Sequence, residues 1–317
     1  KGSPACGPLL LFQKMKAVKF LDGIIPLYKE RGMTSFDCVS RLRRILHTKK
    51  IGHSGTLDPN VDGVLPICVG QATKVVEFLM ASGKQYVGEL LVGQATTTQD
   101  LDGEVVAQKP VTAPIDEDTI KQAMQERTGD IVQIPPMYSA IKVNGKKLYE
   151  YARVGETVER PKRHVHIARF EMTASSYDEK KQQQRIRFVV DCSKGTYVRT
   201  LAYDLAEKLG YPGVMSSLTR TKSGGFELDQ TLSLSDIQDA MEAQNMDRYV
   251  YPMDYALQNY PHLELTEAQW KKVQNGGWLS GLNTKEPEIA LTYQGEVKAL
   301  YQAKDQLYKP LKMLSTK

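Results

Sequence analysis

The sequence predicts an α+β protein, in which amphipathic helices accompany a sheet, and its length predicts about two domains. The chain has 317 residues, more than one domain of typical size contains. Strand-like apolar runs recur between residues 23 and 301, and segments with helical periodicity stand between several of them. The hydrophobic fraction of 41% is enough for a buried core, and the 25% of charged residues are mixed along the chain, which argues against extended disorder.

Composition limits the possible classes of function. Lys and Arg number 42 against 37 Asp and Glu, and the net charge of +5 permits a polyanionic partner without demonstrating one. No apolar run reaches the roughly 18 residues that a membrane span needs. Scattered cysteines without a Cys-x-x-Cys pair indicate a reduced, cytoplasmic protein, and two histidines at strand spacing without further ligands predict no metal site. These residues are Cys6, Cys38, Cys68, Cys192, His164 and His166.

The first predicted elements follow a stretch that fits none of the later patterns. Residues 1–20 lack the charged start and the cleavage site of a signal peptide, so we interpret them as an expression leader and leave them out of the fold. Residues 23–28 are predicted to form a short apolar strand. Thr34 or Ser35 can cap the helix that follows, whose apolar positions are Val39, Leu42, Ile45 and Leu46.

Glycines and prolines are dense between Gly52 and Pro66, which predicts a structured loop that then re-enters an apolar core. Within this loop Asp58 stands before Pro59, and a proline restricts the backbone of the residue that precedes it. Such restriction suits a carboxylate that must be held in one place. Taken alone, the Asp-Pro pair is better explained as an Asx turn or a cap, because turn acids greatly outnumber catalytic ones.

The next stretch alternates helices, strands and polar turns. A helix is predicted through residues 75–79, and Tyr86 leads into a strand over 87–93. A polar loop over 96–103 separates this strand from an amphipathic helix over 116–127, which a glycine ends.

The following region is basic, aromatic and interrupted by glycine from residue 134 to residue 163. This composition suits phosphates and stacked bases, although an ordinary solvated loop has the same composition. Alternating apolar residues predict a half-buried strand over 185–192. A short turn then leads into a helix over 201–209 that Gly210 stops.

The C-terminal part reads as a separate, β-rich unit. A polar stretch rich in Tyr and Asn places a boundary near residues 255–262. A short capped helix over 265–277 and a hairpin over 289–301 follow.

Three motifs carry a resemblance to a known family. They are Gly52-His53-Ser54-Gly55-Thr56-Leu57-Asp58-Pro59 with the following Gly63-Val64-Leu65-Pro66 and Gly70-Gln71-Ala72-Thr73-Lys74, then Lys194-Gly195-Thr196-Tyr197-Val198-Arg199-Thr200, then Ser217-Leu218-Thr219-Arg220-Thr221. Together they resemble the signature of the TruB-type tRNA pseudouridine synthases. The resemblance implies a mixed, largely antiparallel sheet with flanking helices, and a small C-terminal PUA-like β barrel. It assigns residues 21–257 to a catalytic domain, about 134–166 to an RNA-binding thumb, and 258–317 to an RNA-binding domain.

The same resemblance implies a site and its chemistry. Making pseudouridine breaks the bond between uracil and ribose, turns the base and rejoins it to the ribose through carbon. The site must supply a nucleophile, a way to hold the detached base, proton transfer and exclusion of water, but neither a cofactor nor a metal. The implied catalytic residues are Asp58, Tyr86 and Arg199, with the arginine keeping the carboxylate ionised. The implied substrate contacts are His53, Tyr197, Leu218 and Asp100. The implied RNA contacts of the thumb are Lys142, Lys146, Lys147, Arg153, Arg160 and Arg163.

The implied partner is the T stem-loop of tRNA, with uridine 55 of the tRNA as target, bound by a cytoplasmic monomer without an obligate protein partner. Attack of the aspartate on ribose C1′ and attack on uracil C6 are both open. Three other functions are alternatives: a non-catalytic RNA-binding or RNA-remodelling protein, a guide-RNA-dependent relative, and a glycosidase-like enzyme. The first needs no nucleophile and the second commonly has basic extensions, whereas the third needs two carboxylates about 5 Å apart.

Overall fold

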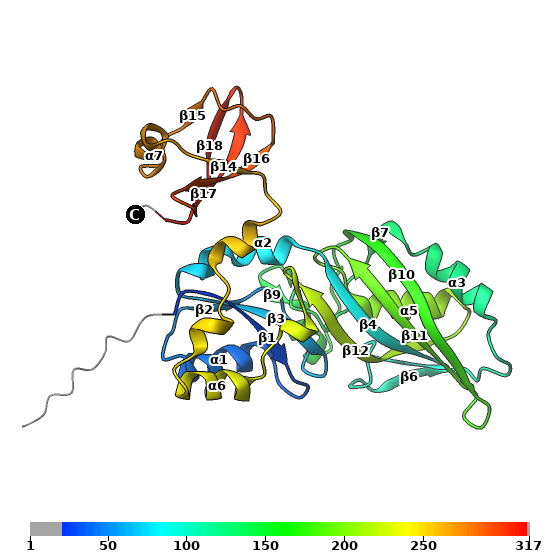
Figure 1. The fold of residues 1–317 in the computed structure, drawn as a ribbon. Helices are drawn as coiled ribbons and strands as arrows, with labels where there is room; N and C mark the ends of the chain where they lie inside the picture. Colours follow the sequence, from blue (N-terminus) through cyan, green and yellow to red (C-terminus); the bar gives the residue numbers. More distant parts are fainter. Residues whose placement is uncertain (1–20, 316–317) are drawn as a thin grey trace, which may run out of the picture.

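The computed structural model describes residues 21–315, so the expected leader at 1–20 lies outside the described residues (Figure 1). One sheet of nine strands forms the larger part of the molecule. Its strands are β1 (Gly23–Lys29), β2 (Ile51–His53), β3 (Asp62–Val69), β4 (Lys84–Val92), β7 (Gly129–Gln133), β10 (Arg163–Asp178), β11 (Gln183–Cys192), β12 (Gly213–Ser223) and β13 (Phe226–Glu227).

The strand order is β1-β3-β12-β4-β11-β10-β7, with β2 on β3 and β13 on β12. Strands β12 and β3 pair in parallel, and the other pairs of this sheet are antiparallel. The predicted class, α+β with a mixed and largely antiparallel sheet, is therefore confirmed. Because β12 lies between β3 and β4, it joins the N-terminal strands to the rest of the sheet.

Helices cover the sheet in two groups (Figure 1). Helices α1 (Ser35–Ile45) and α6 (Leu234–Glu242) enclose one core with β1 to β3, and α3 (Glu117–Gln125) and α5 (Val198–Lys208) enclose another with β4, β10 and β11. Both cores are fully apolar at their centres, where Leu42, Ile67 and Ile237 meet in the first and Leu90, Phe188 and Leu201 meet in the second.

The start of α1 is fixed by its cap. The Thr34 hydroxyl accepts a hydrogen bond from the backbone N–H of Asp37 at 3.0 Å, and the Asp37 carboxylate accepts one from the backbone N–H of Thr34 at 2.8 Å. This reciprocal capping box satisfies two N–H groups that the helix leaves open. It also fixes the position of Ser35, whose hydroxyl contacts the loop between β2 and β3.

A second, curled sheet of five strands forms the C-terminal part (Figure 1), as expected for a PUA-like barrel. Its order is β14 (His262–Glu264), β16 (Glu288–Tyr293), β17 (Glu296–Lys304), β18 (Leu307–Met313) and β15 (Leu279–Ser280), and α7 (Glu267–Val273) packs on it. This part is joined to the larger one by a shared apolar core that includes Leu79 and Leu300. A hydrogen bond from Lys74 Nζ to the Leu314 carbonyl, at 2.7 Å, closes the junction.

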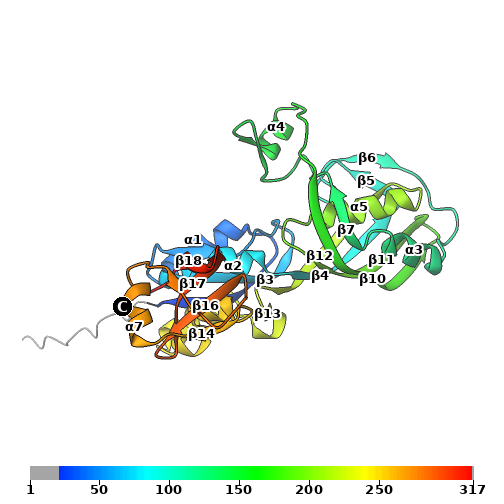
Figure 2. The same cartoon turned by 90° about the horizontal axis from the view of Figure 1, so that it is seen from above.

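Residues 134–162 leave the sheet between β7 and β10 and project from the body as a separate lobe (Figure 2). The lobe contains β8 (Lys142–Val143), β9 (Lys146–Lys147) and the short helix α4 (Leu148–Arg153). We call this lobe the thumb. It ends before residue 166, because β10 already begins at Arg163.

The predicted helices and the predicted strands at 23–28, 87–93 and 185–192 are confirmed, and so is the hairpin over 289–301. The loop predicted over 52–66 is too long, because β2 and β3 occupy its two ends. Pro66 reads as a turn signal, but it faces Pro26 across β1 and β3. In an antiparallel pair, opposed residues either exchange two backbone hydrogen bonds or exchange none. Proline has no N–H to donate, so two prolines can face each other at a pair that exchanges none.

Gly63 at the start of β3 provides a test of this packing. Its φ is +114°, and a Cβ there would lie 2.2 Å from the carbonyl oxygen of Arg220 on β12. Because neither backbone can move without breaking the β3–β12 junction, we expect Gly63→Ala to lower the free energy of unfolding by more than about 2 kcal/mol in urea titrations. Gly155→Ala is the control, with φ +71° and open space around it, and should cost about 1 kcal/mol. Equal losses would contradict this account of Gly63.

Candidate active site

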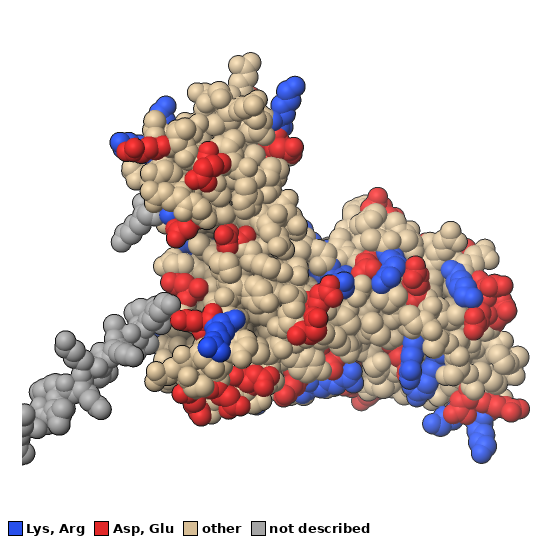
Figure 3. Space-filling model, in the orientation of Figure 1, with Lys and Arg blue, Asp and Glu red and all other residues tan. Residues whose placement is uncertain are grey.

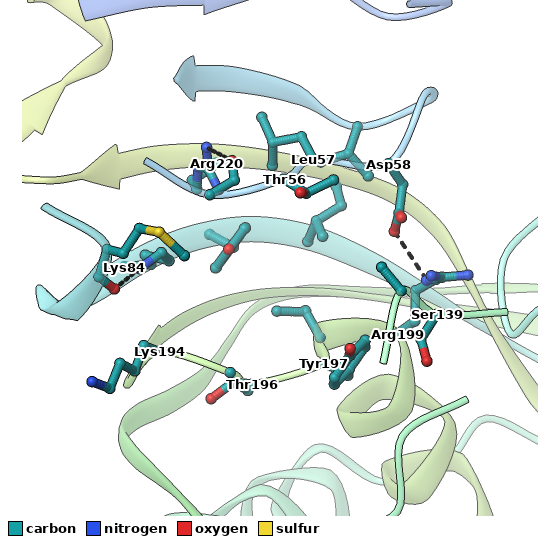
Figure 4. Close-up of a pocket in the computed structure, with 18 of the residues that line it drawn as sticks. Thr56, Leu57, Asp58, Lys84, Ser139, Lys194, Thr196, Tyr197, Arg199 and Arg220 are labelled. Atoms are coloured by element: carbon teal, nitrogen blue, oxygen red, sulfur yellow. Dashed lines mark hydrogen bonds and ion pairs between the residues drawn. The ribbon is translucent and has the colours of Figure 1, made fainter. Parts of the chain in front are cut away.

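A cavity of about 290 Å³ opens between the β2–β3 loop, strands β4 and β12, and the turn that precedes α5 (Figure 4). Every motif that the sequence singles out contributes to its wall. The lining residues that matter below are Gly55, Thr56, Leu57, Asp58, Val61, Lys84, Tyr86, Ser139, Lys194, Gly195, Thr196, Tyr197, Arg199, Leu218 and Arg220.

The β2–β3 loop, residues 54–61, is fastened from both sides. Ser35 Oγ accepts a hydrogen bond from the backbone N–H of Leu57 at 2.9 Å. Lys29, which is fully buried, donates from Nζ to the carbonyls of Val61 at 2.7 Å and Pro59 at 3.1 Å. A buried ammonium group in this place needs such acceptors, and burial lowers the pKa of Lys29. The loop is therefore held where it turns its acidic side chain into the cavity.

Asp58 and Arg199 form an ion pair at one end of the cavity (Figure 4), with Asp58 Oδ2 3.1 Å from Arg199 Nε. The Arg199 side chain is 8% exposed, whereas that of Asp58 is 43% exposed and thus open to a ligand. Although part of its surface is open to the cavity, Asp58 is surrounded by enough protein that loss of solvation raises its pKa above the ordinary aspartate value, and the charge of Arg199 opposes that rise. The pair places an ionisable carboxylate, held in position by a permanent cation, at the surface of the cavity.

Arg199 also makes three contacts away from the cavity. Its Nη1 lies 2.9 Å from Asp100 Oδ2 and donates to the carbonyl of Thr98 at 3.0 Å, and its Nη2 donates to the carbonyl of Tyr138 at 3.1 Å. Every guanidinium nitrogen therefore has an acceptor, which fixes the orientation of Nε toward Asp58. Since Tyr138 belongs to the thumb, one side chain connects the thumb, the 96–103 loop and the carboxylate.

The floor of the cavity is the shared face of β4 and β12. Tyr86 pairs directly with Arg220, and Gly88 pairs with Leu218, so these side chains stand on the same side of the sheet. Tyr86 is 7% exposed and Leu218 6% exposed. Burial raises the pKa of the Tyr86 phenol and the neighbouring Arg220 charge lowers it, with a net rise, so the phenol keeps its proton at neutral pH. The flat ring of Tyr86 can stack against a planar base.

Tyr197 stands opposite this floor at the start of α5 (Figure 4). The side-chain amide of Gln133 holds its backbone on both sides, accepting from the Tyr197 N–H at 3.0 Å and donating to its carbonyl at 3.2 Å. Gln133 is 1% exposed and is the last residue of β7 before the thumb. The position of the Tyr197 ring thus depends on the same strand from which the thumb begins.

The structure brings together most of the residues that the sequence singles out, but not all. Asp58, Tyr86, Tyr197, Arg199 and Leu218 share the cavity. Asp100 is not part of its wall and lies behind Arg199. His53 is also outside the wall, half-buried in β2, where its Nδ1 accepts from the Gly55 N–H at 3.3 Å. Burial and the charge of Arg220 lower the pKa of His53.

The six basic residues predicted for the thumb fall into two groups. Lys142, Lys146, Arg153 and Arg163 are exposed, whereas Lys147 and Arg160 are half-buried. Arg160 donates from Nη1 to the carbonyl of Pro135 at 3.0 Å, which closes the base of the thumb. Near the thumb tip, Lys146 lies over the Tyr151 ring and Arg153 over the Tyr149 ring.

Sequence reasoning missed four residues around the cavity: Lys29, Lys84, Gln133 and Arg220. Lys84 donates from Nζ to the carbonyls of Met80 and Ser82, and burial together with the Arg220 charge lowers its pKa to about 8. Backbone carbonyls hold most of these side chains, and such partners leave no trace in a sequence. Arg220 could have been found from the sequence, because it lies inside the motif at 217–221.

Within residues 21–315, no group of three or more His, Cys, Asp and Glu side chains is arranged to hold a metal ion. The same residues include no helix that has both the length and the apolar character to cross a membrane.

Two family models match the chain: TruB family pseudouridylate synthase (N-terminal domain) over residues 43–198, and tRNA pseudouridylate synthase B C-terminal domain over 199–258. The chain is 69% identical over 299 residues to tRNA pseudouridine synthase B of Limosilactobacillus reuteri, a match that covers 93% of this chain and 99% of the relative. The protein of the same name from Levilactobacillus brevis is 58% identical over 301 residues, with the same coverage. Of solved structures, a Cbf5-Nop10-Gar1 complex aligns with a TM-score of 0.70 at 26% identity, covering 94% of this chain and 86% of that one.

Proposed function

The chain belongs to the TruB family of pseudouridylate synthases, and on this basis we propose that it converts a uridine in the T-loop of tRNA into pseudouridine. The observation that carries the proposal is the Asp58–Arg199 pair, set 3.1 Å apart at the end of a cavity with an aromatic and aliphatic floor. A binding protein needs no such nucleophile. In this proposal the target base enters the cavity, and to do so it must leave its stack.

In the proposed reaction Asp58 is the nucleophile, and the C1′–N1 bond of the target uridine breaks with its electron pair going to the uracil. The detached ring turns between Tyr86 and Leu218, and its C5 forms the new bond to C1′. The bond that Asp58 made to the nucleotide breaks and returns the carboxylate, and the C5 proton leaves while N1 gains a proton. Substrate and product are isomers, so atoms and electrons balance without a cofactor. Direct attack at C1′ and initial attack at C6 both fit the position of Asp58, since both require an ionised carboxylate beside the nucleotide.

The residues around the pair take supporting roles in this proposal. Arg199 keeps Asp58 ionised, and Asp100 positions Arg199 rather than contacting the nucleotide. Tyr86 supplies the stacking surface and a protonated phenol for proton transfer. Tyr197 closes the cavity from the side of α5, and His53, outside the wall, supports the RNA loop after the target has left it.

A glycosidase-like reaction is the enzymatic alternative, because Asp100 provides a second carboxylate near Asp58. Both acids contact Arg199, but Asp100 is only 15% exposed, is bonded to Arg199 and the Thr98 hydroxyl, and does not line the cavity. A second catalytic acid must reach the leaving group. The geometry therefore favours isomerisation.

RNA recognition is proposed to use the thumb and the C-terminal sheet, with residues 21–257 as the catalytic domain and 258–317 as a PUA-like RNA-binding domain. Acidic side chains gather over the part of the surface near α1 and α6 (lower left in Figure 3), which a polyanion would avoid. The thumb, whose residues Ser139 and Ala140 line the cavity, instead presents exposed cations such as Lys146 and Arg153. The three described cysteines, Cys38, Cys68 and Cys192, are free and buried, which supports the proposal of a cytoplasmic enzyme.

The experiment that tests the substrate uses unmodified tRNA transcripts. Carbodiimide labelling followed by primer extension should map one new pseudouridine, in the T-loop, after incubation with the wild-type protein. A transcript with cytidine in place of that uridine is the control and should stay unlabelled. A stop elsewhere in the tRNA would reject the T-loop as the target, and no stop on any tRNA would reject the isomerase proposal.

Binding of tRNA should weaken steeply as the salt concentration rises, because cations of the thumb contact phosphates; variants of the thumb test this. Removing one cation that neutralises a phosphate should make the slope of log K against log salt concentration shallower by about 1. We expect this for Lys146→Ala and Arg153→Ala in filter-binding titrations, with little change in the rate at saturating tRNA. Lys180→Ala, exposed in the β10–β11 turn at the other end of β10, is the matched control. Unchanged slopes in both thumb variants would place the RNA elsewhere.

The rate should fall on acidification at a pH above the ordinary aspartate range. Burial raises the pKa of Asp58, so its carboxylate takes up a proton, and stops acting as a nucleophile, at a higher pH than an exposed aspartate would. Single-turnover rates measured with saturating enzyme against pH check this. An acid limb at or below the pH where a free aspartate titrates would show that Asp58 is not desolvated.

A further inference from the structure

Arg220 is one of the largest fully buried side chains of the described chain, at 1% exposed, and the proposed function gives it no task. Its Nε donates to the carbonyl of Val64 at 2.8 Å and its Nη2 to the carbonyl of Gly55 at 3.2 Å. These bonds hold the guanidinium in one orientation, between the β2–β3 loop and the floor of the cavity (Figure 4).

Within residues 21–315, no carboxylate lies at ion-pair distance from Arg220, in contrast to Arg199, which has two. The hydrogen-bond acceptors of Arg220 are neutral carbonyl groups. The charge of Arg220 adds to the effect of burial in lowering the pKa of Lys84. A buried guanidinium cannot shed its proton, so the fold keeps an uncompensated positive charge at this end of the cavity. Such an arrangement is unfavourable unless a ligand supplies negative charge there.

The position of the charge indicates which part of a ligand it faces. Arg220 is the direct cross-strand partner of Tyr86 and shares its face of the sheet with Leu218. Tyr86 and Leu218 form the surface on which a planar base would rest, whereas the Asp58–Arg199 pair stands at the other end, where the ribose carbon would react. The charge of Arg220 therefore lies beside the base.

Chemistry supplies the negative charge at that place. When the C1′–N1 bond breaks, its electron pair goes to N1 and spreads over the ring to the carbonyl oxygens O2 and O4. If Asp58 adds to C6 first, electrons move to the same ring and to O4. Both routes thus load the base with negative charge before the new bond between C5 and C1′ forms. A preorganised cation next to that charge stabilises it without reorganisation.

We propose that Arg220 is a further catalytic residue, whose guanidinium stabilises the anionic uracil between cleavage of the C1′–N1 bond and formation of the C5–C1′ bond. The inference rests on the proposed function. It gives the two cations of the cavity different tasks: Arg199 keeps the nucleophile Asp58 ionised, and Arg220 stabilises the charge on the base.

The competing role is structural, because Arg220 also fastens Gly55 and thereby the Asp58 loop. Three variants separate the two roles. Arg220→Gln removes the charge and retains an amide donor, whereas Arg220→Lys keeps the charge but cannot form the forked hydrogen bonds to Val64 and Gly55. Ser35→Ala is the matched control, since it removes a different anchor of the same loop, at Leu57, and changes no charge.

The test compares single-turnover loss of the N1-linked nucleoside in RNA that contains uridine with that in RNA that contains 5-fluorouridine. Fluorine withdraws electrons and makes the ring a better leaving group, so a variant without the cation should gain more from it than the wild type does. On RNA with uridine, we expect the single-turnover rate of Arg220→Gln to be about 100-fold or more below that of the wild type. On RNA with 5-fluorouridine, the loss of rate relative to the wild type should be several-fold smaller. Its affinity for tRNA should stay within about three-fold of wild type, since the charge acts on the reacting base.

Arg220→Lys should keep most of the uridine rate, and Ser35→Ala should lose equally on both substrates. Losses by Arg220→Gln that are equal on the two substrates, or no loss, would overturn the proposal. If Arg220→Gln does not fold, Arg220→Lys decides: a loss as large as that of Ser35→Ala and equal on both substrates shows a structural role. Wild-type protein inactive on both RNAs would reject the proposed function itself, whereas an active wild type with insensitive variants rejects the role of Arg220 alone.

Discussion

Replacing Asp58 by asparagine should abolish pseudouridine formation, with the single-turnover rate falling by at least about 10⁴-fold. Asparagine keeps the size of the side chain and its place after Leu57, but it offers no anionic oxygen to the nucleotide. Arg199 would keep Asp100 and two carbonyls as acceptors, so the surrounding structure should persist. The measurement is rapid-quench analysis of nucleosides with enzyme in excess over tRNA.

The same variant should not lose stability, and this provides its control. Because burial raises the pKa of Asp58, folding holds its proton more tightly than the unfolded chain does, and stability from this group is lost as pH rises through the folded-state pKa. Asparagine has no such proton. Asp58→Asn should therefore be as stable as the wild type in acid and more stable at neutral pH in urea titrations. A less stable variant at neutral pH would show that Asp58 serves the fold.

Replacing Arg199 by methionine should have the second largest effect, a rate loss of about 10²- to 10³-fold. Methionine fills a similar volume without charge, and the pKa of Asp58 should rise further because the cation that opposes the effect of burial is removed. The acid limb of the pH–rate profile should then move toward neutral pH. Rates of the variant and wild type, measured from acid to alkaline pH at saturating enzyme, give both quantities.

Asp100→Asn separates positioning from charge in the same network. It keeps a hydrogen-bond acceptor for Arg199 Nη1 and removes one negative charge that raises the pKa of Asp58. Its loss of rate should be smaller than that of Arg199→Met, and its acid limb should shift the opposite way. If Asp100→Asn loses as much as Asp58→Asn, Asp100 takes part in the chemistry and the isomerase mechanism proposed above is incomplete.

The fold followed well from the sequence wherever periodicity and caps coincide. The helix after Thr34, the strand over 185–192 and the hairpin over 289–301 combine a clear apolar pattern with a local start or stop signal. Strand β12 could not be predicted in that way. It is central in the sheet, but polar residues such as Thr219 and Arg220 follow Leu218, because each side chain meets a specific partner rather than a general apolar environment.

Only some residues of the site could be predicted from the sequence, because the others act through backbone groups. Asp58 and Arg199 carry charges that the proposed chemistry requires, so the resemblance to a family points to both although 141 positions separate them (199 − 58). Lys29 and Gln133 act through backbone carbonyls and N–H groups, which every residue has. No residue pattern records such partners. Residues whose partners are backbone groups are therefore found by structure rather than by motif.

The contacts of Arg199 give the site a consequence beyond its chemistry. The side chain that orients Asp58 also binds the carbonyl of Tyr138 in the thumb, and Gln133, from which the thumb begins, holds Tyr197. A thumb that closes on RNA would thus act on the same groups that meet the nucleotide. Under the proposed function, catalysis and RNA capture would share their supports, and this would favour reaction only on a fully engaged substrate.

The most direct test of the central claim compares isomerisation and binding for the wild type and Asp58→Ala on one unmodified tRNA transcript. We predict a T-loop pseudouridine with the wild type, none with Asp58→Ala, and dissociation constants that agree within about three-fold, since Asp58 serves the chemical step. Pseudouridine formed by Asp58→Ala would contradict the account, because the carboxylate would not be the nucleophile. Tight binding without isomerisation by either protein would instead identify an RNA-binding protein built on the same scaffold.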